Sequence, residues 1–429
     1  MSHQGFRTRA IHAGTKPSRH GGATSVPLYN SASFAFDSAE DLAMAFEGRH
    51  PGYIYSRISN PTVRAFEARI ASLENGLASF AAASGMAAIN TLFATLTEAG
   101  SRVVFARSLF GGTLLYLRDI AARVGVAVDL VDLEDAEAVE AALADSGRGR
   151  PRFLFTETLG NPRLDVADIP RIAEQARRAG VPLIVDATLS SPALFDGKSG
   201  GASVVMHSTT KYISGNGTVV GGVITDLATF DWSTHQSSAI ARGLKEGGTR
   251  LAFALALRRQ GGLNTGVVMS PFNAYLGLLG LETLDLRMRA HVRNAHALAG
   301  FLREHPGVDR VRYPGLQDDP YYDVALASYP GLQAHGAPAA RIPAVGALLT
   351  FDVGSRERAF AVANALKLAT TATNLGDAKT LIIHAASTIF HDCSDEEKQF
   401  SGVTEGLLRV SVGIEDIDDL IADFDQALK

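Results

Sequence analysis

The sequence predicts an α/β fold in which a mostly parallel β-sheet is flanked by helices. Short runs rich in β-branched residues alternate with segments of helical period, and several of these runs are apolar throughout. The run 182–185, Pro-Leu-Ile-Val, has no polar face, as expected for a strand that is covered on both sides. The 429 residues are enough for two domains, each with its own core.

Six strands are expected in the first 225 residues, each followed by a turn or a helical segment. Their ranges are 102–105, 126–131, 152–156, 182–185, 204–207 and 222–225. Residues 169–179 carry apolar side chains at steps of three and four, which is typical of a helix that lies on a sheet. An earlier apolar stretch, 79–82, runs into Ser84, where another helix is expected to begin.

The pattern changes after Pro271 to one long amphipathic helix, which we interpret as a bridge into a smaller C-terminal domain. Its apolar stripe comprises Leu281, Leu284, Met288, Val292, Ala295, Leu298 and Leu302. The span 313–343 is rich in Pro, Tyr and Gly, which predicts a long surface loop near the domain interface. We expect an N-terminal arm over 1–62, a large domain over 63–270, and the bridging helix and small domain over 271–429.

Composition and charge exclude several classes of protein. With 46% hydrophobic and 20% charged residues, the chain is neither disordered nor a disulfide scaffold. A net charge of −5 and the lack of a long basic run argue against nucleic acid as a partner. The single cysteine, Cys393, has no metal-ligand spacing around it, so we expect no metal site and a reducing compartment.

No targeting or membrane segment is expected, which predicts a cytoplasmic protein. Residues 1–9 lack the apolar core of a secretory signal. The charge-free stretches 75–97 and 261–281 are long enough to span a bilayer, but polar residues and Pro271 interrupt them.

Lys211 closes a run that delivers hydroxyls and one amine to a single turn after an apolar strand. The run is Val204-Val205-Met206-His207-Ser208-Thr209-Thr210-Lys211. An amine there can form a Schiff base with an aldehyde cofactor, and the hydroxyls of Ser208 and Thr210 can hydrogen-bond a phosphate. Pyridoxal phosphate (PLP) requires this combination. A lysine after a strand is usually a solvated surface residue, so the interpretation depends on the surrounding chain.

Polar residues also follow two neighbouring strands. Asp186 ends the strand at 182–185, while Glu157 and Asn161 follow the strand at 152–156. In open parallel sheets, ligands bind beyond the carboxyl ends of the strands. A carboxylate opposite a pyridine nitrogen keeps it protonated, which makes the cofactor ring an electron sink. Asp186 is placed for that role, although an isolated aspartate there is more often a helix cap or turn residue.

The turn Ala83-Ser84-Gly85-Met86-Ala87-Ala88 is a candidate phosphate site. It opens a helix after an apolar stretch, which exposes unpaired backbone N–H groups at the positive end of the helix dipole. Gly85 permits close approach of the backbone. The glycine-rich run 214–222 precedes a strand instead of following one, so we interpret it as a tight turn behind the lysine and not as a dinucleotide-binding loop.

Four motifs, in order and at consistent spacing, resemble the Cys/Met-metabolism family of PLP-dependent enzymes. They are Tyr55-Ser56-Arg57-Ile58-Ser59-Asn60-Pro61-Thr62, Ser84-Gly85-Met86, His207 to Lys211 with Gly215-Asn216-Gly217, and Leu408-Arg409-Val410-Ser411-Val412-Gly413-Ile414-Glu415-Asp416. The resemblance covers nearly the whole chain. It implies the PLP-transferase fold type I, which is aspartate aminotransferase-like, with a smaller C-terminal α+β domain. Within the family, the runs 372–384 and 402–406 are most similar to O-acetylhomoserine sulfhydrylases.

The resemblance implies roles around the cofactor. Lys211 would hold PLP as a Schiff base and then shuttle protons, Asp186 would pair with the pyridine nitrogen, and Asn161 would lie near the phenolic oxygen. The remaining residues that would contact PLP are Ser84, Gly85, Met86, Phe110, Ser208 and Thr210; the N–H groups of Gly85 and Met86 and the two hydroxyls after the strand would bind its phosphate.

The resemblance also implies a substrate clamp and a partner subunit. Arg409 would bind the substrate carboxylate in a bidentate manner, with the Asn374 region helping to seat it. Tyr55 and Arg57 would reach the phosphate of a neighbouring subunit, because the N-terminal arm crosses a dimer interface in this family. A homodimer or homotetramer with shared active sites is therefore expected.

The implied activity is γ-replacement, in which O-acetyl-L-homoserine and sulfide or a small thiol give L-homocysteine or L-methionine and acetate. O-succinylhomoserine sulfhydrylase, cystathionine γ-synthase and methionine or cystathionine γ-lyase remain alternatives. A non-catalytic relative is a further alternative, against which the joint presence of Lys211, Asp186 and Arg409 argues.

The sequence departs from the family at two positions. Phe110 stands where many members carry a tyrosine that stacks on the cofactor ring, so stacking is kept and a phenol is lost. Acetate or succinate leaves as a stable anion and needs less help from a proton donor, which favours the sulfhydrylases over the lyases. A single Phe is by default a core residue, which is the alternative. Ala187 follows Asp186 where relatives often have a polar residue, and nothing in the sequence indicates its effect.

Overall fold

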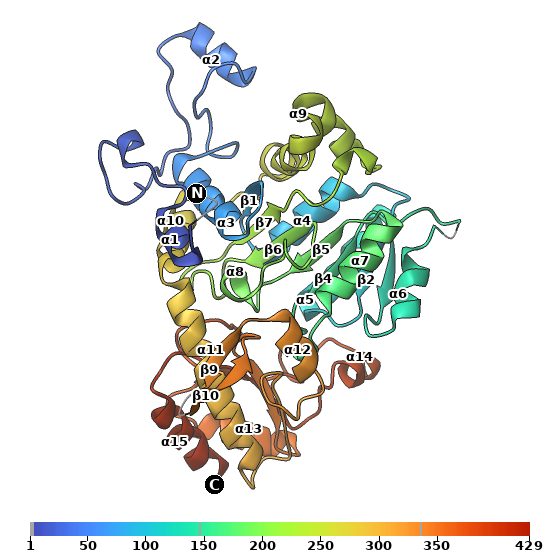
Figure 1. The fold of residues 1–429 in the computed structure, drawn as a ribbon, viewed down its shortest axis with the longest axis vertical. Coiled ribbons are helices and arrows are strands. Elements are labelled where there is room, and N and C mark those ends of the chain that lie inside the picture. The colour runs from blue at the N-terminus through green and yellow to red at the C-terminus, as the bar shows by residue number, and fades with distance from the viewer. Residues whose placement is uncertain (1–3, 146, 335–336) are drawn as a thin grey trace.

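The structure, a computed structural model, describes residues 4–145, 147–334 and 337–429 (Figure 1). Residues 1–3 of the predicted arm and 335–336 of the predicted loop lie outside this part. The main sheet has seven strands in the order β1-β7-β6-β5-β4-β2-β3. They are β1 Ala78–Ala82, β2 Arg102–Ala106, β3 Ala127–Val131, β4 Leu154–Glu157, β5 Leu183–Asp186, β6 Val204–Ser208 and β7 Gly222–Asp226.

Strands β2 to β6 pair in parallel, whereas β7 pairs antiparallel with both β1 and β6. The predicted mostly parallel sheet is confirmed, and each of the six expected strands begins and ends within two residues of its expected range. Because β7 reverses direction, its first residue, Gly222, pairs with Ser208 at the end of β6. The Lys211 turn and the start of β7 therefore share one edge of the sheet.

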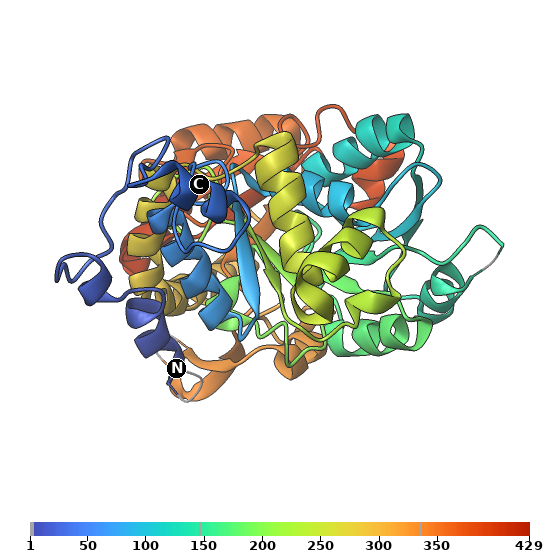
Figure 2. The same ribbon diagram turned by 90° about the horizontal axis from the view of Figure 1, so that it is seen from above.

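Helices cover both faces of this sheet (Figures 1 and 2). One face packs against α3 Pro61–Leu73, α6 Ala136–Leu143, α7 Ile169–Ala179 and α8 Ser191–Leu194. The other packs against α4 Gly85–Leu96, α5 Gly111–Tyr116 and α9 Ser238–Leu257. Helix α7 has the predicted bounds. Each of its buried residues except Gln175 is apolar, as the helical period indicated.

Two consecutive helices, α10 Pro271–Glu282 and α11 Leu284–Glu304, lead from the main sheet to a second sheet. All seven residues of the predicted apolar stripe are buried, but the single long helix that was predicted is two helices, because Leu281 lies on α10 and the other six residues lie on α11. The second sheet has the order β12-β13-β14-β11-β8 and is antiparallel except for the β12–β13 pair. Its elements are β8 Arg310–Arg312, β11 Leu348–Asp352, α13 Arg356–Ala365, β12 Thr370–Thr371, β13 Leu381–His384, α14 Asp395–Phe400, β14 Leu407–Ser411 and α15 Ile417–Leu428.

The prediction of a long surface loop over 313–343 was wrong. The span contains helix α12 Tyr322–Ser328 and the paired strands β9 Gly331–Ala334 and β10 Ala337–Pro343. Tyr313 and Tyr329 are buried, and the Tyr313 hydroxyl donates to the Gly346 carbonyl at 3.0 Å. The Pro and Gly content indicates turns, but it does not indicate whether the aromatic residues between the turns are buried in the core.

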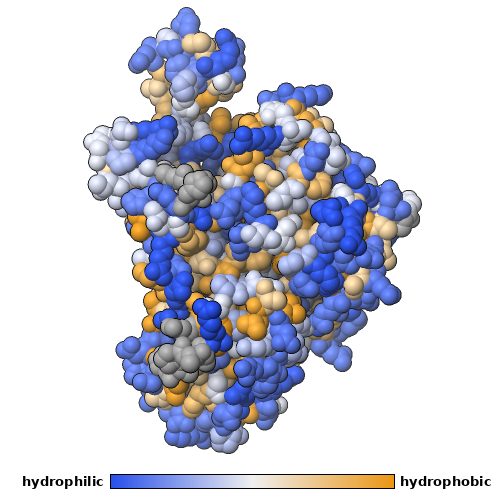
Figure 3. All heavy atoms as spheres, viewed as in Figure 1, coloured by the Kyte–Doolittle hydropathy of each residue, from blue (hydrophilic) through white to orange (hydrophobic). Residues whose placement is uncertain are grey.

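The N-terminal arm carries α1 Phe6–His12 and α2 Ala39–Phe46. The segment around α2 stands clear of the body of the molecule (Figures 1 and 3). Phe46 at its end is 68% exposed. The arm is tied down at its other end, where Asn60 caps α3 and its side-chain amide donates to the Tyr29 carbonyl at 2.8 Å. Within the described ranges, no helix is both long and apolar enough to cross a membrane.

Candidate active site

A cavity of about 270 Å³ lies where β4, β5 and β6 end. Ten of the predicted site residues line it, and they come from both sheets. They are Ser84, Gly85, Met86, Phe110, Asn161, Asp186, Ser208, Thr210, Lys211 and Arg409. The strand-end position that the sequence indicated is therefore where these residues meet.

Lys211 lies in the turn after β6 and is largely buried. Burial, together with the positive charge of Arg409, lowers the pKa of its amine to about 8. Its Nζ donates to the side-chain oxygen of Asn374 at 2.7 Å. A lysine with a lowered pKa is a better nucleophile near neutral pH than an exposed one, which suits an amine that must react with an aldehyde.

Asp186 ends β5 and pairs in parallel register with Glu157 at the end of β4. The Thr188 backbone N–H donates to Asp186 at 2.9 Å, and the Phe110 backbone N–H donates to Glu157 at 2.7 Å. Burial raises the pKa of Asp186 above its usual value, while Thr188 and the nearby His207 oppose that shift. Burial and the charge of Asp186 raise the pKa of Glu157 well above its usual value.

The residues predicted to bind the phosphate lie together at one edge of the cavity. Ser84 caps α4 by accepting the Ala87 N–H at 3.0 Å, which leaves the first N–H groups of the helix free to face the cavity. A Cβ on Gly85 would lie 3.1 Å from the Cβ of Ser208, so a larger residue would push the Ser208 side chain away. The Thr210 hydroxyl accepts the Gly221 N–H at 3.0 Å, which fixes it at the same edge.

Arg409 on β14 brings a buried guanidinium to the opposite wall. It donates to the Asn161 side chain at 3.3 Å and to the Asn374 carbonyl at 3.0 Å. Its Nε has no hydrogen-bond partner among the described residues. Burial lowers its pKa to about 10, so it stays charged near neutral pH. A buried cation held by amide oxygens, with a free donor beside an open cavity, is suited to a carboxylate ligand.

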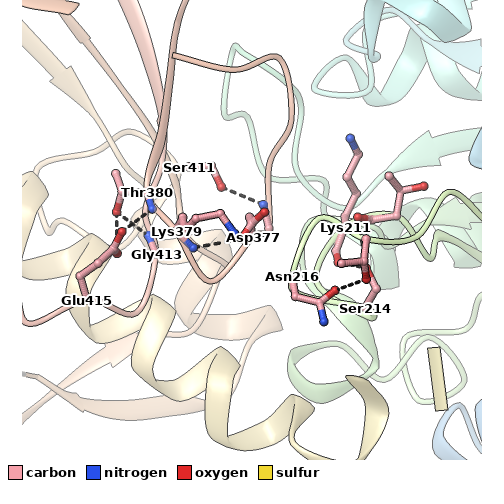
Figure 4. Close-up of polar contacts among 12 residues, drawn as sticks. Lys211, Ser214, Asn216, Asp377, Lys379, Thr380, Ser411, Gly413 and Glu415 are labelled. Carbon is pink, nitrogen blue, oxygen red and sulfur yellow. Dashed lines mark hydrogen bonds and ion pairs between the residues drawn. The ribbon is translucent and has the colours of Figure 1, made fainter. Parts of the chain in front are cut away.

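A loop between β12 and β13, which includes Asp377 and Lys379, lies beside the turn that carries Lys211 (Figure 4), and its Asn374 side chain contacts the Lys211 amine. A Cβ on Gly376 would lie 2.7 Å from the Tyr212 nitrogen, and the Ala378 N–H donates to the Gly215 carbonyl at 2.9 Å. Glu415 holds the far end of the loop, because it accepts both the backbone N–H and the hydroxyl of Thr380, at 2.6 and 2.9 Å. The loop thereby joins the second sheet to the lysine.

A family model described as "Cys/Met metabolism PLP-dependent enzyme" matches residues 7–429. The chain belongs to this family of PLP-dependent enzymes. The predicted family and cofactor are thus confirmed. The cavity fits PLP, since it offers a lysine with a lowered pKa, a carboxyl at a strand end, and the N-terminus of a helix that begins at Gly85.

Individual members are similar over almost their full length. An O-acetyl-L-homoserine sulfhydrylase from Leptospira meyeri is 38% identical, covering 98% of this chain and 96% of that protein. An L-methionine gamma-lyase from Pseudomonas putida is 39% identical, covering 99% and 97%. A solved structure from Campylobacter jejuni, assigned as an O-acetylhomoserine (thiol)-lyase, has a TM-score of 0.87 at 30% identity and covers 99% of this chain and 100% of that chain. It contains a pyridoxyl-lysine phosphate. This Cys/Met-metabolism enzyme has PLP fold type I, as predicted.

Three predicted residues do not line the enzyme's own cavity: Asn374, which still contacts Lys211, and Tyr55 and Arg57. Tyr55 and Arg57 are not among the cavity-lining residues, and Tyr55 is 44% exposed. Arg57 donates to the carbonyls of Gly262 and Leu263 at 3.1 and 2.7 Å. This position leaves open the predicted role in a neighbouring subunit, and that role stays a prediction.

Some residues of the cavity had not been predicted. Glu157, Thr188, Thr373, Leu375 and Ile389 also line it. The strand-end position singled out Glu157, but no motif indicated a role. Ile389 lies in the segment between β13 and α14, for which the sequence offered no signal. In the described part of the chain, no group of three or more His, Cys, Asp or Glu residues could hold a metal ion.

Proposed function

We propose that the enzyme catalyses γ-replacement on O-acetyl-L-homoserine, with sulfide or a small thiol as the nucleophile. The products are L-homocysteine or L-methionine, together with acetate, which places the reaction in methionine biosynthesis. The observation that carries the proposal is that Lys211 and Arg409 line one cavity and are both hydrogen-bonded to Asn374. An amine, an amide and a buried guanidinium together suit a substrate that has an amino group and a carboxylate on one carbon.

Each side chain has a defined task in this proposal. Arg409 binds the substrate carboxylate through its fork of donors and orients the amino acid. Bound PLP supplies an electron sink that stabilises negative charge on the substrate carbons. Lys211 removes the proton from Cα and moves protons at Cβ, which its pKa of about 8 permits because the amine and ammonium forms are both populated near neutral pH. The Cγ–O bond then breaks, acetate leaves, and sulfur bonds to Cγ.

Phe110 supports an ester as the substrate. Its ring lines the cavity, and it has no hydroxyl with which to donate a proton to a leaving group. Acetate leaves as a stable anion without such help, whereas a thiolate leaving group benefits from a donor. The name of the Leptospira relative, a sulfhydrylase, supports an ester as the substrate. The name of the Pseudomonas relative, a γ-lyase, makes elimination the alternative reaction to test.

The first test is a product assay with purified holoenzyme. O-acetylhomoserine and sulfide should give homocysteine and acetate in equal amounts, and omission of sulfide should abolish homocysteine. A parallel reaction with O-succinylhomoserine decides the acyl group. Release of ammonia and a 2-oxo acid from methionine or cystathionine without a nucleophile would instead assign a γ-lyase.

We further propose that the enzyme acts in the cytoplasm as a homodimer or homotetramer. The arm, residues 1–62, crosses to a partner and brings Tyr55 and Arg57 to the partner's phosphate site; residues 63–270 form the PLP-binding domain and 271–429 the bridging helix and small domain. The exposed segment around α2 supports this arrangement, because Phe46 and Leu42 there are exposed apolar residues that a second copy could cover.

A further inference from the structure

Two carboxyl groups, those of Glu157 and Asp186, lie side by side in the wall of the cavity. They are the last residues of adjacent parallel strands and are paired in register. Both line the cavity, and Glu157 is only 8% exposed. Neighbouring carboxyl groups in a dry site cannot both ionise without a nearby cation.

The charged groups around the pair offer no cation to Glu157. Those that act on it are Asp186 and Asp165, which are both acidic. In the described part of the chain, the Lys211 amine is hydrogen-bonded to Asn374, and the Arg409 guanidinium to Asn161 and the Asn374 carbonyl. With no cation beside Glu157, a second negative charge at this pair is unfavourable, so one of the two carboxyls holds a proton.

Hydrogen bonds decide which carboxyl holds it. Asp186 accepts the Thr188 N–H at 2.9 Å, is also hydrogen-bonded by the Thr188 side chain, and feels His207. Glu157 accepts one N–H, that of Phe110, at 2.7 Å. Donors stabilise the ionised form, so the charge settles on Asp186 and the proton on Glu157. The raised pKa of Glu157 agrees with this division.

We propose that Glu157 is an uncharged carboxylic acid in the holoenzyme, a positioning residue that leaves the negative charge on Asp186 and holds the backbone of Phe110. Phe110 precedes α5 and has no side-chain cap of its own, so Glu157 fixes the segment that carries the cavity ring. Glu157 also lines a second cavity of about 310 Å³, beside Ser108 and Asp165, from which it can exchange its proton. The inference rests on PLP binding and not on the proposed substrate.

Infrared spectroscopy of the holoenzyme tests the protonation state directly. The wild-type spectrum should contain a carboxylic-acid C=O band that shifts in D₂O and that is absent from the spectrum of Glu157→Gln. Glu304→Gln is the control, because Glu304 is exposed and its replacement should remove only carboxylate bands. Loss of carboxylate bands in the Glu157→Gln difference would overturn the proposal.

The visible spectrum of bound PLP gives a second readout, again without substrate. Glutamine has the shape of a neutral glutamic acid, so Glu157→Gln should keep the absorption maximum, whereas Asp186→Asn should shift it. Glu157→Leu leaves the buried Phe110 N–H unpaired and should weaken cofactor binding about tenfold. A shift in Glu157→Gln that equals the shift in Asp186→Asn would show that Glu157 carries charge and contradict the proposal.

Discussion

Lys211 reacts with PLP as a free amine, so the rate of that reaction should follow its pKa. Burial and Arg409 lower this pKa to about 8, against 10.5 for an ordinary lysine. The neutral amine therefore accumulates as the pH rises through 8, and incorporation of PLP into apoprotein should level off at about pH 9. Stopped-flow absorbance measures the rate. Arg409→Met removes the neighbouring charge and should move the inflection to higher pH; a wild-type rate that still climbs at about pH 10 would refute the assignment.

Arg409 should set the affinity for the substrate more than the rate of turnover. Arg409→Lys keeps the charge but removes the planar fork of donors, so KM for the amino-acid substrate should rise about 10- to 100-fold with a smaller change in kcat. Steady-state kinetics give both constants. The absorption spectrum of bound PLP serves as the control, and an unchanged KM would place the carboxylate elsewhere.

At the scale of single residues, the sequence predicted the site residues that a motif or a strand end marks. Lys211, Asp186 and Arg409 were found because strand ends and family spacing mark them. The proposed proton on Glu157 could not be predicted from the sequence, because it depends on the register of β4 and β5 and on which charged residues of the described chain lie beside Glu157. The contact of Asn374 with Lys211 likewise joins positions 163 residues apart.

The loop that carries Asn374 is held at one end by Glu415, which makes an element-scale prediction possible. Glu415→Ala leaves the Thr380 N–H and hydroxyl without their acceptor and should lower the free energy of unfolding by about 1–3 kcal/mol. Because the loop positions Asn374, KM should also rise, while the spectrum of bound PLP stays unchanged. Denaturant unfolding and kinetics measure the two effects.

Thr380→Val is the comparison variant for the loop, since it keeps the backbone contact with Glu415 and removes the two hydrogen bonds of the hydroxyl, one to Glu415 and one from the Gly413 N–H. It should lower the free energy of unfolding by about 1–3 kcal/mol, because the buried Gly413 N–H loses its acceptor. Equal kinetics in wild type and Glu415→Ala would mean that the loop keeps its position without Glu415.

Elements with a strong period were predicted well and mixed segments were not. The six strands and α7 were recognisable because burial on a sheet requires continuous or periodic apolar residues. Helix α12 and the β9–β10 pair were missed, since they are short and their stability comes from packing under α11 and not from their own pattern. The antiparallel direction of β7 was also invisible, because pairing direction leaves no mark in five residues.

At the scale of the whole molecule, the proposed exchange of arms can be tested by mixing two inactive variants. Lys211→Ala removes the lysine from its own cavity, and Arg57→Ala removes the residue offered to the partner. If Arg57 serves the neighbouring subunit, a mixed dimer has one intact site, and an equimolar mixture should recover about one quarter of wild-type activity.

Subunit exchange followed by an activity assay makes this measurement. Arg49→Ala is the matched control from the same arm, because Arg49 is exposed and pairs with nearby Glu47. It should be active alone. Failure of the two variants to complement would assign Arg57 to its own chain, where it already binds the carbonyls of Gly262 and Leu263.

The division of the cavity between the two sheets also has a consequence for biosynthesis. Every cavity residue from Ser84 to Lys211 leaves the ribosome before Asn374, which follows the lysine by 163 residues. The residues of the phosphate cradle and the reactive amine are thus synthesised while the carboxylate clamp has yet to be translated. A chain that bound PLP at that stage would hold its cofactor before it could bind an amino acid.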